Sequence, residues 1–320
     1  MPRARLIALL ALYVALFVVP LGAYVRLSDA GLGCPDWPGC YGKLVGVPEH
    51  PDEHVAAEQA FPGKPVEAGK AWKEMIHRYV AGTLGLVVFA ASVLAWRRRP
   101  LVAALLVGTI VFQALLGMWT VTLLLKPAIV TAHLLGGMTI IGLLTILAMP
   151  ERNTCSRQAV PPGAARLAIA ALVLLVIQIG LGGWVSSNYA GLACQDFPTC
   201  QGVWLPSMDF AHGFTLKREL GYTGDGTLLP FAALTAIHWA HRLGALLVFL
   251  TVGALILRLK ASPGWRNWAF VLTVTLVLQL GLGIANVLLS LPLPLAVAHN
   301  FGAARLLLHV VAVTMRLSGH

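Results

Sequence analysis

The chain has 320 residues, of which 58% are hydrophobic and only 11% charged, a composition that excludes an ordinary soluble domain and indicates a polytopic membrane protein. Its net charge of +10 follows from basic residues that set membrane topology, and it gives no reason to expect nucleic-acid binding. A helix that crosses a bilayer needs about 20 mostly apolar residues. In chain order we predict eight such spans, near 6–26, 74–96, 101–125, 128–150, 166–187, 231–257, 267–290 and 295–316.

The first apolar run is too long for the core of a signal peptide and lacks a small-residue cleavage site, so we predict a retained span. Short segments rich in Arg and Lys mark the cytoplasmic side of a membrane. An even number of spans puts both termini on one side, and the basic residues of that side are opposed by a single acid, Glu151. The sequence therefore predicts that both termini face the cytoplasm.

Two long loops, roughly 27–73 and 188–230, then face outward. They contain four of the five cysteines, spaced as Cys34 with Cys40 and Cys194 with Cys200. Cysteines paired by spacing on the oxidising side favour two short-loop disulfides. Zinc is a poor alternative, because no second ligand pair accompanies either pair. Neither pair forms Cys-x-x-Cys-His, which excludes covalent haem attachment at these positions.

The two halves of the chain resemble each other. Gly22 to Cys40 recurs at an offset of 160, and Gln113 to Gly117 recurs at an offset of 166. Parallel repeats of this kind are a known membrane architecture. We predict an all-α membrane protein of two tandem four-helix bundles with the same orientation, 1–150 and 166–320. They are joined by a cytoplasmic linker at 151–165, in which Cys155 is expected to be a free thiol.

The start of the second span carries Glu74, His77 and Arg78. Glu74 and His77 are three residues apart, so they share one face of a helix. The counterpart 164 residues later is His238, His241 and Arg242, in which a histidine replaces the glutamate. One further histidine follows near the start of a span in each half: His133 in the first and His299 in the second.

These histidines lie at a common depth. His77, His133, His241 and His299 precede the cytoplasmic ends of their helices by 17 to 20 residues, which is roughly 25–30 Å at 1.5 Å per residue. Two imidazoles at one level on different helices of a bundle suit the two axial positions of one haem. A single histidine at such a place is more often hydrogen-bonded or interfacial, but repetition in pairs favours ligands, because ionisable residues inside spans are costly and usually functional.

Other polar residues near these histidines leave alternatives. His238 could compete with His241 as the ligand; His241 is preferred because, like His77, it is followed by arginine. Arg78 and Arg242 suit haem propionates, or else extend to the outer headgroups, and Arg305 is a weaker third candidate. Glu74 has no acidic counterpart, so we expect the first half to do chemistry with Glu74 as acid or base, and the second to carry electrons or stabilise.

In combination, these features resemble the haem A synthase family over almost the whole chain: eight spans, Cys-x5-Cys loop pairs, Glu-x-x-His-Arg on the second span and single histidines on spans four, six and eight. The resemblance implies oxidation of the C8 methyl of haem O to a formyl group by successive hydroxylations, yielding haem A for terminal oxidases. It implies a haem b cofactor ligated by His241 and His299, and haem O as the substrate flanked by His77 and His133, with Glu74 important to turnover.

The resemblance also implies a bacterial cytoplasmic (inner) membrane, and haem O synthase and terminal oxidase assembly factors as candidate partners. The Cys34 and Cys40 pair matches the first-loop pair of the family, which implies a functional disulfide, whereas Cys194 and Cys200 are expected to be structural.

The implied mechanism leaves one question open and two other functions are conceivable. If both His77 and His133 bind the substrate iron, no position remains for oxygen, so either one histidine dissociates or the oxidation does not occur at that iron. A di-haem b-type carrier of electrons from quinol would need the same four histidines, but would have no use for an acid in one half only. A haem transporter or chaperone would need an open pathway and weaker axial ligation.

Overall fold

The computed structural model describes residues 3–150 and 160–319, so Cys155 and most of the predicted linker lie outside the described residues. The described chain forms no strand, and its long helices are α1 (Arg3–Leu27), α3 (Ala68–Ala95), α4 (Pro100–Thr122), α5 (Pro127–Ala148), α6 (Ala164–Ser187), α8 (Phe231–Lys260), α9 (Arg266–Leu288) and α10 (Leu293–Leu317). Short helices in the loops are α2 (Pro51–Ala60), α7 (Phe210–Gly213), η1 (Ala190–Leu192) and η2 (Pro263–Trp265). Among the described residues, eight helices are long and apolar enough to cross a membrane, which confirms the predicted spans.

The helix ends follow from local sequence. Pro100 and Pro127 open α4 and α5, where proline lacks only an N–H that would have no helical partner. The start of α3 at Ala68 is six residues earlier than the apolar run predicts, because its first turns contain lysines that form helix without being apolar. Glu74 and His77 therefore lie in the second and third turns of α3 rather than at its mouth.

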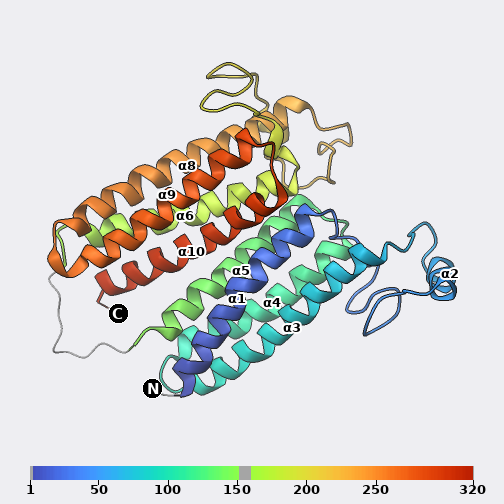
Figure 1. Ribbon diagram of the computed structural model, residues 1–320, viewed down its shortest axis with the longest axis horizontal. Helices are drawn as coiled ribbons and strands as arrows, with labels where there is room; N and C mark the ends of the chain where they lie inside the picture. The colour runs from blue at the N-terminus through green and yellow to red at the C-terminus, as the bar shows by residue number, and fades with distance from the viewer. Residues whose placement is uncertain (1–2, 151–159, 320) are drawn as a thin grey trace.

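The eight long helices form two groups with the same internal order (Figure 1). In the first group α1 packs against α3 and α5, and α4 packs against α3 and α5. In the second group α6 packs against α8 and α10, and α9 packs against α8 and α10. Between the groups α1 packs against α10, and α6 against α5, while α5 and α10 also pack against each other. Equivalent helices thus exchange partners, as in a twofold-symmetric dimer contact.

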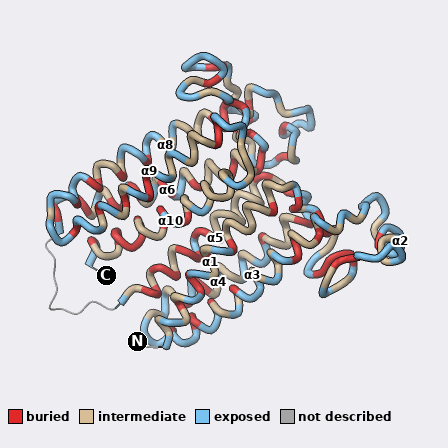
Figure 2. Tube along the Cα trace, viewed as in Figure 1, coloured by how far each residue is buried: buried red, intermediate tan, exposed pale blue. Residues whose placement is uncertain are grey.

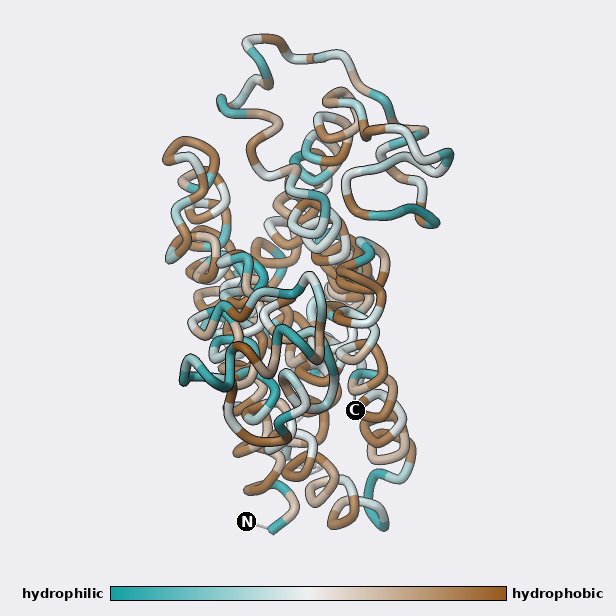
Figure 3. Tube along the Cα trace, turned by 90° about the vertical axis from the view of Figure 1, so that its right-hand side faces the viewer, coloured by the Kyte–Doolittle hydropathy of each residue, from teal (hydrophilic) through white to brown (hydrophobic). Residues whose placement is uncertain are grey.

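Small residues bring the helices together. Ala8, Ala11 and Ala15 of α1 are at most 1% exposed, and alanines of α6 are equally buried. Small side chains let helix backbones approach closely inside a membrane. The buried stripes face neighbouring helices and the exposed stripes face outward (Figure 2). The helices are predominantly apolar, while hydrophilic residues gather in the long loops (Figure 3).

The two long loops project from one end of the helices, and the N- and C-termini lie at the other end (Figure 1). This arrangement is the one expected for an even number of spans. The loops therefore share one side of the membrane, next to the ends of the helices that carry the histidines.

Candidate functional site

A cavity of about 1750 Å³ extends between the helices and is lined by both halves of the chain. This volume exceeds the roughly 300–1,000 Å³ typical of a site for one small ligand. Residues predicted from the sequence that line it are Glu74, His77, Arg78, His133, His238, His241, Arg242 and His299. The structure thus brings every predicted axial ligand to one continuous space that has room for two large ligands.

Each of the four imidazoles lies against a glycine of a neighbouring helix. A Cβ added at Gly22 would lie 2.9 Å from Cε1 of His77, and one at Gly182 would lie 3.1 Å from Cε1 of His241. The same relation joins Gly117 to His133 at 3.3 Å and Gly283 to His299 at 3.0 Å. The rings occupy the space that a side chain at each glycine would need, which explains the repeated glycines. Even the methyl group of alanine would lie too close to the rings.

The ring nitrogens of these histidines suit a bound group that they could ligate. The Nδ1 atoms of His77, His133 and His299 are buried and have no hydrogen-bond partner among the described residues. His77 and His133 line the first half of the cavity, and His241 and His299 line the second. Buried polar atoms rarely remain unpaired. Two pairs of imidazoles, three of which have an unpaired Nδ1, therefore suit axial ligation of two haem irons.

Glu74 and His238 occupy equivalent positions and do the same structural work. The Glu74 carboxylate accepts the backbone N–H of Cys34 at 3.0 Å, and Nδ1 of His238 accepts the backbone N–H of Cys194 at 3.3 Å. Both side chains are buried. His238 therefore holds the second loop as Glu74 holds the first, and His241 is the residue that corresponds to His77.

The two arginines hold the cysteine loops. Arg78 donates to the carbonyls of Asp36 at 3.0 Å and Pro38 at 3.3 Å and to the carbonyl of Gly39, and its Nη2 donates to the Glu74 carboxylate at 2.6 Å. Arg242 makes the equivalent bonds to three carbonyls of the second loop, those of Cys194, Asp196 and Thr199, at 2.7 to 3.0 Å. The sequence analysis missed this role, although the arginines and the Cys-x5-Cys segments are repeated together.

The cysteines pair as expected, Cys34 with Cys40 and Cys194 with Cys200, with S–S distances of 2.02 and 1.99 Å. One aspartate in each loop caps the turn that follows, and the carboxylate of Asp196 accepts the N–H groups of Gln201 and Gly202. A hydrogen bond from the Thr199 hydroxyl, together with these amides, lowers the pKa of Asp196 to about 2. The loops are thus fixed internally as well as by the arginines.

Three glutamines that the sequence analysis left without a role contact the histidine-bearing helices. The side-chain amide of Gln113 donates to the carbonyl of His133 at 2.8 Å, and that of Gln178 donates to the carbonyl of His241 at 3.0 Å. The amide nitrogen of Gln279 lies 3.4 Å from Nε2 of His299. The signal in the sequence was the repeat of Gln113 to Gly117 in the second half.

The walls of the cavity differ between the halves. Gly82 and Gly85 of α3 line the first half, and a Cβ added to either would meet nothing within 4 Å. The equivalent residues of α8, at the offset of 164, are Leu246 and Phe249. Ala114 of α4 corresponds in the same way to Leu280 of α9, at the offset of 166. The first half therefore has open apolar space where large side chains stand in the second.

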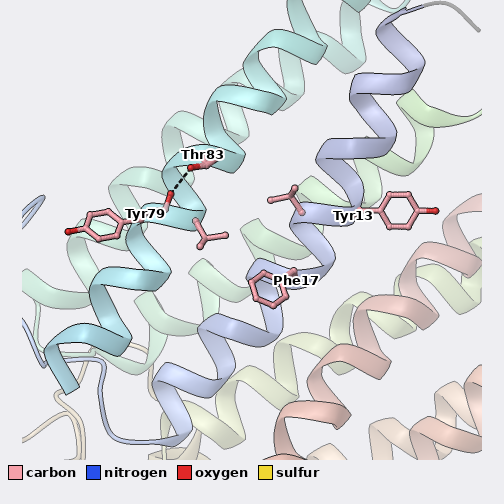
Figure 4. A pocket seen from close by; sticks show the side chains of 6 residues that line it. Tyr13, Phe17, Tyr79 and Thr83 are labelled. Atoms are coloured by element: carbon pink, nitrogen blue, oxygen red, sulfur yellow. Dashed lines mark hydrogen bonds between the residues drawn. The ribbon is translucent and has the colours of Figure 1, made fainter. Parts of the chain in front are cut away.

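A smaller hollow of about 500 Å³ lies on the outer surface between α1 and α3. Figure 4 shows Tyr13 and Phe17 from α1 and Tyr79 and Thr83 from α3 around it, with the Thr83 hydroxyl donating to the Tyr79 carbonyl at 2.9 Å. No imidazole or charged residue lines it. Tyr79 and Thr83 also line the large cavity, so the hollow adjoins the first half of that cavity.

Known proteins resemble this chain over most of its length. Residues 5–311 match the COX15-CtaA family, described as cytochrome oxidase assembly protein. The haem A synthase of Shewanella oneidensis is 44% identical over 313 residues, which cover 95% of this chain and 93% of the relative. The haem A synthases of Halalkalibacterium halodurans and Mesorhizobium japonicum are each 28% identical, over 70% and 74% of this chain and 72% and 69% of their own lengths. By a match over almost its whole length, the chain belongs to the COX15/CtaA family of haem A synthases.

Proposed function

We propose that the first half of this membrane enzyme holds haem O between His77 and His133, while the second half holds haem b between His241 and His299. The reaction is oxidation of the C8 methyl of haem O to a formyl group. The unpaired imidazole nitrogens, the glycines that accommodate the rings and the volume of the cavity fit both porphyrins.

The difference in wall residues carries the assignment of the two halves. Haem O bears a long isoprenoid chain that haem b lacks, so the substrate needs additional apolar space. Gly82, Gly85 and Ala114 leave such space in the first half. Leu246, Phe249 and Leu280 fill the corresponding space in the second. Haem b, which has no such chain, therefore matches the narrower second half, and haem O does not.

Bound haem iron supplies the oxidising chemistry, and the protein supplies position and proton transfer. As a half-reaction, conversion of a methyl group to a formyl group takes up water and releases both electrons and protons, and a carboxylate near the porphyrin can accept the protons. Glu74 is 5% exposed, lines the cavity and is held by Arg78 and the Cys34 amide. We assign Glu74 as this acid–base residue, because the second half has His238 in its place.

The arginines and the topology complete the proposal. Arg242 lines the cavity and its Nε is buried without a partner among the described residues, so it can donate to a propionate while its Nη atoms hold the loop. Arg78, at the equivalent place, would meet the propionates of haem O. The Arg-rich ends opposite the loops support a topology with both termini in the cytoplasm of a bacterium and the loops beyond its inner membrane.

Exchange of wall residues between the halves tests the assignment. The variant Gly82→Leu/Gly85→Phe/Ala114→Leu, purified from cells that also make haem O, should lose haem O and haem A but keep haem b with an unchanged absorption spectrum. Extraction and chromatography of the pigments measure each porphyrin. The reverse variant, Leu246→Gly/Phe249→Gly/Leu280→Ala, should keep haem O and haem A.

Wild-type amounts of haem O in the filled variant would contradict the assignment of the first half. Haem B as the only pigment of the wild-type protein under these conditions would instead favour a di-haem electron carrier.

A further inference from the structure

Three of the four predicted axial histidines belong to a structural module that the fourth lacks. In the module, one helix carries Gln-x3-Gly and its neighbour carries His-x2-Gly. The complete copies are Gln113, Gly117, His133 and Gly136; Gln178, Gly182, His241 and Gly244; and Gln279, Gly283, His299 and Gly302. At the fourth position, α1 has Val18 before Gly22, and α3 has Val80 after His77.

The glutamine and the second glycine depend on each other. In every complete copy the nearest atom to a Cβ added at the second glycine is the glutamine side-chain oxygen, at a distance no two atoms could keep. Gly136, Gly244 and Gly302 therefore make the space that the glutamine side chain fills. At the fourth position both residues differ. Val80 stands where the second glycine would be, and Val18, in place of the glutamine, has no side-chain amide.

In each copy the glutamine amide contacts the histidine that follows it, and in two copies it hydrogen-bonds to the carbonyl of that histidine. Gln178 ties the His241 carbonyl to α6 at 3.0 Å, and its amide nitrogen also lies 3.0 Å from Nδ1 of the ring. Gln113 ties the His133 carbonyl to α4. Polar partners behind a ligating histidine orient the ring, and their loss typically weakens metal binding by about 10- to 100-fold.

His77 has no such restraint. Val18 is a member of the apolar core and Val80 packs against it, so neither offers a hydrogen bond. Within residues 3–150 and 160–319, no side chain of another helix hydrogen-bonds to His77, whose Nδ1 is buried and unpaired. Its ring packs against Gly22 of α1, and the described residues offer its Nδ1 no hydrogen bond.

We infer that His77 is the exchangeable ligand of the four, the imidazole that can leave the iron of bound haem O while His133 remains. This inference rests on the proposed function. It gives the first half a vacant axial position on the α1 side, and it leaves both ligands of haem b fixed. The difference is set by Val18 and Val80, which offer no hydrogen bond to the helix turn that carries His77.

Building the missing module tests the inference. In Val18→Gln/Val80→Gly, purified with haem O bound and reduced, carbon monoxide should bind to the first-half haem about 10-fold or more weakly than in wild type. Absorption spectra measure this without turnover. The matched second-half variant, Gln178→Val/Gly244→Val, should make haem b bind carbon monoxide, whereas we expect haem b in the wild type not to bind it.

Haem O retention gives a second readout that does not depend on the built module. His77→Ala should keep haem O through His133, whereas His133→Ala should lose it. Equal carbon monoxide binding by the wild type and Val18→Gln/Val80→Gly, with haem O present in both, would overturn the inference and leave the proposed function standing. Equal loss of haem O from the two alanine variants would also overturn it. Absence of haem O from the wild-type protein would overturn the proposed function itself.

Discussion

At the scale of single residues, comparison of the two repeats distinguishes the candidate iron ligands from the residues that support the loops. Glu74 and His238 each accept the backbone N–H of the first cysteine of a loop, and His77 and His241 each face a glycine across the cavity. Spacing alone left His238 and His241 as competitors, because both lie on one face of a helix. The hydrogen bond from Cys194 favours His241 as the ligand, because it engages Nδ1 of His238 in the loop.

This separation predicts different outcomes for two neighbouring histidines. His241→Ala should abolish the low-spin haem b spectrum of the purified protein, because it removes an axial nitrogen. His238→Gln should keep that spectrum, since an amide oxygen can still accept the Cys194 N–H. Optical spectra of the two variants, normalised to protein, make the comparison. A normal spectrum in His241→Ala, or its loss in His238→Gln alone, would reverse the assignment.

Glu74→Gln keeps the size of the side chain and an acceptor for the Cys34 amide, but removes the charge and the proton-accepting oxygen. We expect haem O to remain bound while haem A formation falls by about 100-fold or more, the usual range for a lost general acid or base. Pigment analysis of cells that also make haem O gives both quantities. Wild-type haem A levels would make Glu74 a loop support only, equivalent to His238.

At the scale of helices and loops, the histidine-bearing helices need glycine partners only where a ring faces them. Gly283 and Gly281 lie two residues apart on α9. A Cβ at Gly283 would lie 3.0 Å from the His299 ring, whereas a Cβ at Gly281 would meet nothing within 4 Å. The two positions therefore form a matched pair for substitution.

Gly283→Val should displace the His299 ring and weaken haem b binding, while Gly281→Val should leave it unchanged. The expected loss is about 10-fold or more in haem retained during purification, comparable to the loss of a supporting residue at a metal site. The ratio of haem absorbance to protein measures it. Equal retention by both variants would show that the ring can shift without cost, and that Gly283 serves helix packing instead.

The long helices could be predicted from the sequence, whereas the side chains that support the loops and the candidate ligand histidines could not. Apolar runs of bilayer length located all eight spans, and only polar first turns, as in α3, escaped them. The ligand candidates followed from depth and repetition. The roles of Arg78, Arg242 and Gln178 did not, because their partners are carbonyl groups up to 63 residues away in the chain. Backbone carbonyls leave no mark in a sequence, so such contacts need coordinates.

At the scale of the whole molecule, the two halves meet through equivalent positions that carry different side chains. Arg26 and Ser186 are equivalent residues, as are Asp29 and Tyr189, at the offset of 160. Arg26 donates to the Ser186 carbonyl at 3.1 Å and lies 4.1 Å from the centre of the Tyr189 ring. The Tyr189 hydroxyl donates to Asp29 at 2.7 Å. Equivalent positions meet across the interface, but with different side chains that only the correct pairing of halves supplies.

The halves should therefore assemble without the connection between them. Residues 1–150 and 160–320, expressed as two chains in one cell, should co-purify through one affinity tag and retain haem b, because α1, α5, α6 and α10 supply the contact. Each chain must be present in the membrane when expressed alone, which immunoblotting establishes. Separate purification of two membrane-inserted halves would contradict this expectation.

Arg26→Ala in the two-chain protein tests the specific part of that contact. The Arg26 side chain is 10% exposed, and its hydrogen bonds to the Ser186 and Ser187 carbonyls cross the interface. Hydrogen bonds from a charged group are worth about 1.5–3 kcal/mol, so the substitution should weaken association of the separate halves by about 10- to 100-fold. In the continuous chain the same substitution should leave haem b content unchanged, because the connection keeps the halves together. Co-purification that is insensitive to Arg26→Ala would assign the association to the apolar helix faces alone.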